Sequence, residues 1–144
     1  MVERRTRRRP GENRRRLLEA GLVEFGLFGY HGASTSGIAA RAGVPQPHVY
    51  ASFATKQELF LACLERLSEL GESSELDEPG ESTDDKTRTD QDALQRFLHQ
   101  AVAASRDPAL GETVNVALSA LRLRAGDRRF EELLARGALL LLDV

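Results

Sequence analysis

Few residues in this sequence could perform chemistry. The histidines are His31, His48 and His99, and the single cysteine is Cys63. None of the histidines has another histidine, a cysteine or a carboxylate at a spacing typical of metal ligation or nucleophilic catalysis. Cys63 falls on the apolar stripe of an expected helix, where cysteine behaves as a small hydrophobe. The chain also has no glycine-rich phosphate loop, so the sequence predicts neither an enzyme nor a metal or cofactor site.

The stretch GVPQPHVYASFATKQELF, residues 43–60, raises a different question, namely which side chains a short helix could expose to solvent. Proline is tolerated only at the edge of a helix, so Pro45 and Pro47 predict a sharply started helix with Pro47 in its first turn. Val49 and Phe53, four residues apart, form its expected buried side. The side chains left on its other faces are those of Gln46, His48, Tyr50 and Ser52.

Amphipathic helices are expected on both sides of this short one. Leu18, Leu22 and Phe25 recur at helical spacing in a first helix. Ser34 is the expected N-cap of a short second helix, and Gly43 its stop. The inward residues of that helix and its turn are expected to be Ile38, Ala39, Ala42 and Val44. Three helices before residue 54, two of them short and joined by a tight glycine turn, are the pattern of a helix-turn-helix.

A fourth helix is expected to follow directly. Thr55-Lys56-Gln57-Glu58 has the form of a capping box, in which the threonine and glutamate side chains satisfy free backbone N–H groups. The apolar stripe of this helix comprises Leu59, Phe60, Cys63, Leu64, Leu67 and Leu70.

The charge of the 144-residue chain is divided unequally between its two parts. Residues 1–56 hold ten basic and four acidic residues, a net charge of +6, whereas the remainder holds ten basic and 18 acidic residues, a net charge of −8. A basic front end is the electrostatic footprint of a chain that meets a polyanion, and a solvated tail that binds nothing is the alternative. The sequence has no apolar run long enough to span a membrane, and no signal-peptide core follows the arginines.

The segment from Arg15 to Leu67 resembles the N-terminal DNA-binding domain of the TetR family of bacterial transcriptional regulators. The runs that carry the resemblance are LLEAGLVEFGLFGYHGAS, IAARAGV and VYASFATKQELF. The Gln46-Pro47 pair resembles a subgroup with Gln-Pro at the start of the recognition helix. Pro45 stands where a capping serine is common, and Ala51 and Ser52 replace residues that are usually larger.

The resemblance implies a role for each group of residues. The residues expected to read bases are Gln46, Pro47 and His48, since an amide pairs bidentately with adenine and an imidazole donates or accepts. Those expected to bind phosphates are Ser34, Tyr50, Ser52 and Lys56. The basic arm contributes Arg7, Arg8, Arg9, Arg14 and Arg15. Tyr50 as a packing residue and His48 as a solvated surface histidine remain the alternatives.

The C-terminal part is expected to be helical and shorter than in family members. Residues 72–92 are acidic and nearly free of apolar side chains, which favours a linker. Helical periodicity returns at Leu94, Phe97, Leu98, Ala101 and Val102, and Asp107-Pro108 then breaks it. A second segment has Leu110, Val114, Ala117, Leu118 and Leu121 on one side. Gly126-Asp127 is expected to end that segment and cap a last helix, and the run from Leu139 to Leu142 is expected to be core or dimer interface instead of ligand pocket. No pocket residue is assigned.

The expected fold class is all-α: an N-terminal three-helix helix-turn-helix domain joined through a long fourth helix to a short helical C-terminal domain. The expected divisions are a basic flexible arm (1–11), the DNA-binding domain (12–54), a connecting helix (55–71), an acidic linker (72–92) and a truncated effector and dimerisation domain (93–144). The expected function is a sequence-specific repressor that binds a palindromic double-stranded operator as a homodimer and is released by a small-molecule effector. It would act in the bacterial cytoplasm at the nucleoid and use no membrane. The alternative is a truncated relative that acts through protein contacts, such as heterodimerisation.

Overall fold

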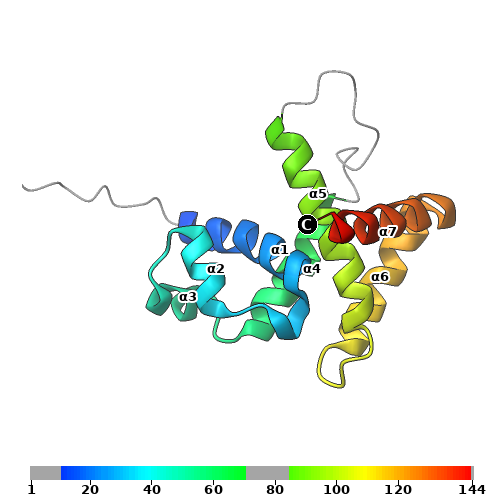
Figure 1. Cartoon of the computed structure of the whole chain (residues 1–144). Helices are drawn as coiled ribbons and strands as arrows, with labels where there is room; N and C mark the ends of the chain where they lie inside the picture. Colours follow the sequence, from blue (N-terminus) through cyan, green and yellow to red (C-terminus); the bar gives the residue numbers. More distant parts are fainter. Residues whose placement is uncertain (1–10, 71–84, 144) are drawn as a thin grey trace, which may run out of the picture.

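The computed structural model describes residues 11–70 and 85–143, and these residues form seven α-helices and no strand. The helices are α1 (Glu12–Gly32), α2 (Thr35–Ala42), α3 (Gln46–Ser52), α4 (Lys56–Leu70), α5 (Asp85–Ala104), α6 (Gly111–Ala125) and α7 (Asp127–Leu142). In Figure 1, α2 and α3 form one end of the molecule, α6 and α7 form the other, and α5 crosses between them. The all-α prediction and its helix-turn-helix are confirmed. No helix within the described residues is long and apolar enough to cross a membrane.

The turns around α2 and α3 follow the predicted chemistry. Ser34 caps α2 by accepting a hydrogen bond from the Gly37 N–H at 3.0 Å. Gly43 ends the helix in the left-handed conformation, with φ 66° and ψ 34°, which glycine adopts at little cost. Pro45 is the residue that caps α3, and Pro47 is the second residue inside that helix. The N–H that proline lacks would have had no helical partner there.

The start of α4 resembles the predicted capping box with one difference. Thr55 Oγ1 accepts from the Glu58 N–H at 3.1 Å, as expected. The Glu58 carboxylate, however, accepts from the N–H of Ala54 at 2.9 Å, one residue earlier than a standard box requires. Both bonds together fix the chain between α3 and α4, which sets the position of α3.

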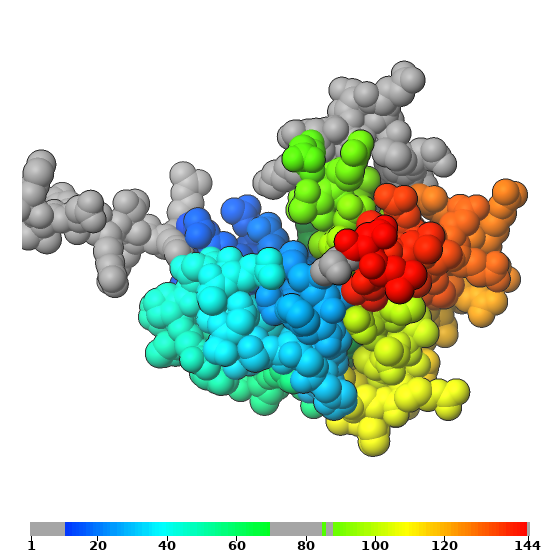
Figure 2. All heavy atoms as spheres, viewed as in Figure 1, coloured from blue at the N-terminus to red at the C-terminus, as the bar shows by residue number. Residues whose placement is uncertain are grey.

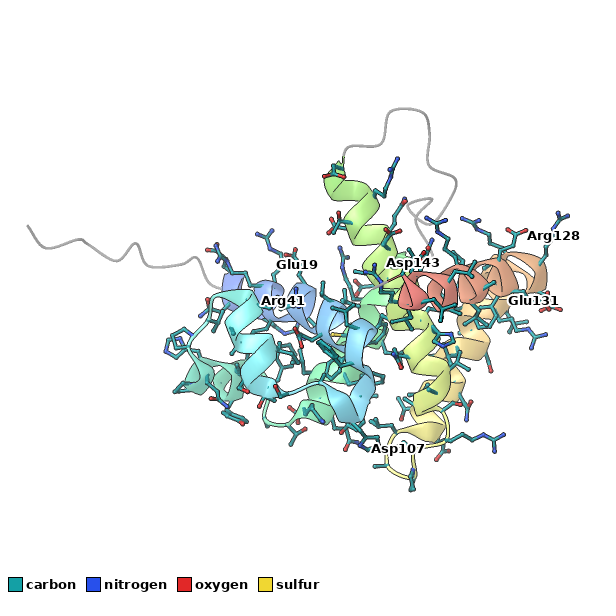
Figure 3. The ribbon with its side chains drawn as sticks, viewed as in Figure 1. Glu19, Arg41, Asp107, Arg128, Glu131 and Asp143 are labelled. Carbon is teal, nitrogen blue, oxygen red and sulfur yellow. The ribbon has the colours of Figure 1, made fainter. Side chains whose placement is uncertain are left out.

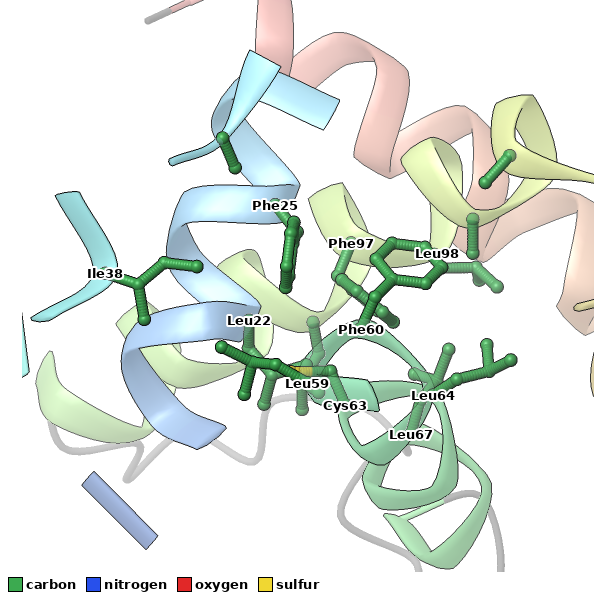
Figure 4. Packing of buried hydrophobic residues seen from close by; sticks show 14 of the residues in the cluster. Leu22, Phe25, Ile38, Leu59, Phe60, Cys63, Leu64, Leu67, Phe97 and Leu98 are labelled. Atoms are coloured by element: carbon green, nitrogen blue, oxygen red, sulfur yellow. The ribbon is translucent and has the colours of Figure 1, made fainter. Parts of the chain in front are cut away.

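One hydrophobic core joins the N-terminal helices to the C-terminal ones (Figure 4). Phe60 of α4 contacts Phe25 of α1 edge to face, with ring centroids 5.1 Å apart, and lies 5.2 Å from the ring of Phe97 on α5. All three rings are fully buried. Gly26 of α1 permits the close crossing with α5, because a Cβ there would lie 3.2 Å from the backbone nitrogen of Phe97. Helices α1 and α4, on which α2 and α3 are built, are therefore packed directly on α5.

Most residues predicted to face the core are buried. Leu18 of α1 is only half-buried, and the exposed exceptions lie in the C-terminal part. Val102 is 38% exposed. Leu139 and Leu142 are 59% and 79% exposed, so the ends of the C-terminal leucine run are not core in this chain. The dimer-interface interpretation of that run stays a prediction.

Two boundaries differ from the predicted ones. α5 begins at Asp85, so the predicted linker, 72–92, overlaps its first turns. A helix anchored by packing further along can extend through polar residues, because propagation is easier than nucleation. Asp127 does not cap α7 but is its first residue, and its carboxylate accepts from Arg122 Nε at 2.7 Å. Positions 1–10 of the predicted arm and 72–84 of the predicted linker lie outside the described residues.

Candidate nucleic-acid interface

The short helix α3 lies at the surface at one end of the molecule (Figure 2), and its polar residues Gln46, His48 and Tyr50 are exposed. Val49 is 1% exposed and Phe53, the residue that follows the helix, is 4% exposed, so both anchor α3 as predicted. The three residues predicted to read bases, Gln46, Pro47 and His48, are all exposed. Because a seven-residue helix is marginal alone, these two anchors determine where its outer face points.

Tyr50 is 52% exposed, and its hydroxyl lies 3.3 Å from Thr35 Oγ1 in the first turn of α2. This pair connects the two short helices at their surface. The sequence patterns did not single out Thr35, and the only signal for it was its position directly after the Ser34 cap. The phenol is thus held by a neighbouring hydroxyl instead of being packed in the core.

The other residues predicted to bind phosphate occupy different settings. Ser34 is exposed, but its hydroxyl already caps α2 and lies 3.2 Å from Ser36 Oγ. Ser52, at the end of α3, is half-buried. Lys56 is also half-buried, and its Nζ donates to the Ala33 carbonyl at 3.2 Å and sits 4.8 Å above the Tyr30 ring. In this structure the Lys56 ammonium group therefore makes its contacts within the chain.

Of the predicted arginine arm, the structure places Arg14 beside Phe53, the residue that follows α3. The guanidinium of Arg14 stacks over the Phe53 ring at 5.0 Å from its centroid, which is a cation–π contact. Arg14 and Arg15 are both exposed. Arg7, Arg8 and Arg9 lie outside the described residues.

A partly buried ion pair fixes α2 against α1. Glu24 is only 8% exposed, the one charged residue in the core of the described chain. Nε and Nη2 of Arg41 each lie 2.8 Å from Glu24 Oε1. Figure 3 shows Arg41 on α2. The sequence patterns did not single out Glu24, because its partner is 17 positions away in another helix.

We expect Arg41→Ala to lower the free energy of unfolding by about 2–3 kcal/mol, because it leaves the Glu24 carboxylate buried without its charged partner. The matched control is Arg16→Ala, which breaks the 3.3 Å pair with Glu12 within one helix surface and should cost about 0.5 kcal/mol or less. Urea unfolding of both variants, followed by circular dichroism, measures the difference. Equal destabilisation of the two variants would show that the Glu24 pair adds no more than a surface pair.

No group of three or more histidine, cysteine, aspartate or glutamate residues within the described ranges could hold a metal ion. Burial raises the pKa of the Cys63 thiol well above its usual range, which disfavours the nucleophilic thiolate.

Comparison with known proteins agrees with this geometry. The model of the family described as "Bacterial regulatory proteins, tetR family" matches residues 17–63, which span most of α1 through the middle of α4. YdgC, an uncharacterised HTH-type transcriptional regulator of Bacillus subtilis, is 37% identical over 81 residues, which cover 54% of this chain and 41% of YdgC. FasR, an HTH-type transcriptional activator of Mycolicibacterium smegmatis, is 47% identical over 64 residues, covering 44% of this chain and 29% of FasR.

The fold extends beyond the matched segment. A solved TetR-like transcriptional regulator from Rhodococcus sp. RHA1 superposes with a TM-score of 0.51 at 21% identity, covering 94% of this chain and 85% of that one. The matched regions amount to less than half the length of the two curated relatives.

The capped α2, the glycine turn and the outward-facing α3 together define a helix-turn-helix protein. More particularly, residues 17–63 match the N-terminal domain of the tetR family of bacterial regulatory proteins. Both curated relatives are named as transcriptional regulators and neither as an enzyme.

Proposed function

We propose that this protein is a sequence-specific DNA-binding transcriptional regulator that represses by occupying a palindromic operator as a homodimer. The observation that carries the proposal is the exposed face of α3, where Gln46 and His48 flank Pro47 above two buried anchors. An α-helix of this kind fits the major groove, and amide and imidazole groups hydrogen-bond to base edges there.

Contacts to the DNA backbone are proposed for the residues around α3. Tyr50 and Thr35 place two hydroxyls at the surface between the short helices, and both can donate to a phosphate oxygen. Arg14, which stacks over Phe53, and Arg15, the next residue of α1, add exposed positive charge. Ser34, Ser52 and Lys56 remain proposed phosphate ligands, although a contact by Lys56 requires its Nζ to leave the Ala33 carbonyl.

The remaining parts of the proposal concern the whole protein. Two recognition helices about 34–36 Å apart would read successive major grooves, which requires a dimer. A small-molecule effector acting on the C-terminal helices would release the DNA, and the protein would act in the cytoplasm at the nucleoid. Since FasR is named an activator, a promoter reporter assay is needed to decide whether operator binding lowers or raises transcription.

Selection of bound sequences from random DNA gives the operator, and fluorescence anisotropy then measures affinity. We expect Gln46→Ala to lower discrimination at one base position in each half-site by about 1–3 kcal/mol, because one bidentate hydrogen-bonded pair is removed. Arg15→Ala should instead weaken all sequences alike and reduce the salt slope by about 0.9 for each phosphate that the variant no longer neutralises.

Arg128→Ala is the control for Arg15→Ala, since it removes the same charge from α7, at the opposite end of the molecule (Figures 1 and 3). It should leave affinity and salt slope unchanged. If the folded wild-type protein selects no DNA sequence at low salt, DNA binding by this chain is excluded, and the alternative of a regulator relative acting through protein contacts takes its place.

A further inference from the structure

Helix α1 is kinked at Gly29, so its last residues depart from the axis of the rest of the helix. Gly29 has φ 76° and ψ 174°, a conformation that is essentially restricted to glycine. Residues 29–33, called here the junction segment, lead from this break to Ser34, the cap of α2. The direction in which α2 begins therefore depends on how the junction segment is held.

α5 holds the junction segment from one side through Gln100. Its Nε2 donates to the Gly26 carbonyl, in the turn before the break, at 3.3 Å. Its Oε1 lies beside Gly29, so close that a Cβ at Gly29 would be 3.1 Å away. The Gln100 amide thus spans the break and fits against the glycine backbone.

The turn between α5 and α6 holds the same segment through Asp107, which Figure 3 places at that turn. His31 Nε2 lies 2.9 Å from Asp107 Oδ2. Asp107 Oδ1 accepts from the N–H groups of Ala109 and Leu110 at 2.8 and 3.2 Å. The Ala109 N–H and, to a smaller extent, His31 lower the pKa of the Asp107 carboxyl. The Asp107 carboxylate therefore connects His31 of the junction segment to the backbone of the turn between α5 and α6.

The recognition side holds the segment in turn. The Tyr30 ring packs against Phe60 of α4 with centroids 5.1 Å apart. Lys56 Nζ donates to the Ala33 carbonyl at 3.2 Å, directly before the cap of α2. Gly29 and His31, which face Gln100 and Asp107, therefore directly precede and follow Tyr30, the residue whose ring packs on α4.

We propose that the junction segment couples the C-terminal helices to the recognition helices, with Gln100 and Asp107 as positioning residues that set the start of α2. A displacement of α5 or of the α5–α6 turn would then be transmitted through Gly29 and His31 to Ala33, and from there to α2 and α3. The effect of this coupling on DNA affinity rests on the proposed function, whereas the coupling itself does not. It links two parts of the chain whatever α3 binds.

Amide hydrogen exchange tests the coupling without DNA. We expect the double variant Gln100→Leu, Asp107→Asn to raise the exchange rates of the Ile38 and Val44 amides by about fivefold or more. The first change removes the bond to the Gly26 carbonyl, and the second removes the carboxylate charge that pairs with His31. Asn at position 107 keeps an oxygen for the Ala109 N–H, so the turn itself is preserved. Amides in the buried middle of α6, such as that of Leu118, should keep the wild-type rate.

The matched control is Asp127→Asn, which weakens the exposed pair with Arg122 between α6 and α7 and should leave the α2 amides unchanged. Equal acceleration of the α2 and α6 amides, or no acceleration in α2, would overturn the proposal, because the first indicates global destabilisation and the second indicates no transmission. If the double variant does not fold, the same exchange measurement is made on each single variant.

Operator affinity is then measured on the same variants, and weaker binding together with faster α2 exchange supports the coupling. A wild-type protein that binds no operator contradicts the proposed function and leaves the exchange result to decide the coupling.

Discussion

Replacing Phe97 by alanine is expected to lower the free energy of unfolding by about 3–5 kcal/mol, the usual cost of deleting a fully buried aromatic ring. Phe97 is 0% exposed and contacts Phe60 of α4 at the crossing of α5 with α1. Because the core is continuous, the destabilisation should appear equally in the unfolding of the N-terminal and C-terminal helices. Urea unfolding, observed by backbone amide signals from α2 and from α6, measures both.

Val102→Ala is the control on the same helix. Val102 is 38% exposed, so its truncation should cost about 0.5 kcal/mol or less. If Phe97→Ala unfolded α5, α6 and α7 while leaving α1 to α4 at wild-type stability, the N-terminal helices would form an independent unit. The continuous core would then not make the two parts unfold together.

Replacing Gly137 by alanine is expected to separate α7 from α5. A Cβ at this position would lie 2.1 Å from the carbonyl oxygen of Gln95, which is backbone and cannot rotate away. Alanine gains about 1 kcal/mol over glycine in helix propensity, whereas forcing an atom into a packed crossing costs about 1–3 kcal/mol and more when backbone must move. We therefore expect a net destabilisation of about 2 kcal/mol, measured by urea unfolding.

Gly32→Ala provides the comparison for Gly137→Ala. It adds the same methyl group to α1, where the nearest atom is the Cβ of Phe28 at 3.3 Å and no backbone of another helix is near. Its change in stability should be small or favourable. A Gly137→Ala protein as stable as wild type would mean that α7 shifts on α5 at no cost, and the α5–α7 crossing would then be loosely determined.

Local patterns predicted the N-terminal fold because its determinants are local. The Ser34 cap, the Gly43 turn and the Val49–Phe53 spacing each depend on residues within a few positions of one another. The exposure of Gln46 and His48 follows directly from burying the opposite face of α3. Their roles in reading bases remain predictions.

What the sequence could not provide depends on contacts between distant residues. The family resemblance favoured a phosphate contact for Lys56, but its partner here, the Ala33 carbonyl, is 23 positions away. His31 and Asp107 are 76 positions apart, and no periodicity relates them. The first turns of α5 contain no apolar residue before Ala93, so composition favoured a linker where packing further along supports a helix.

The attachment of α3 by Val49 and Phe53 has a consequence for how this protein can change over generations. Since these two side chains fasten the helix, substitutions at Gln46, His48, Ala51 and Ser52 alter the outer surface with little disturbance of the packing beneath it. New target preferences can therefore arise one residue at a time with little penalty in stability. The same four positions are a natural choice for a randomised library in which altered preferences are selected directly.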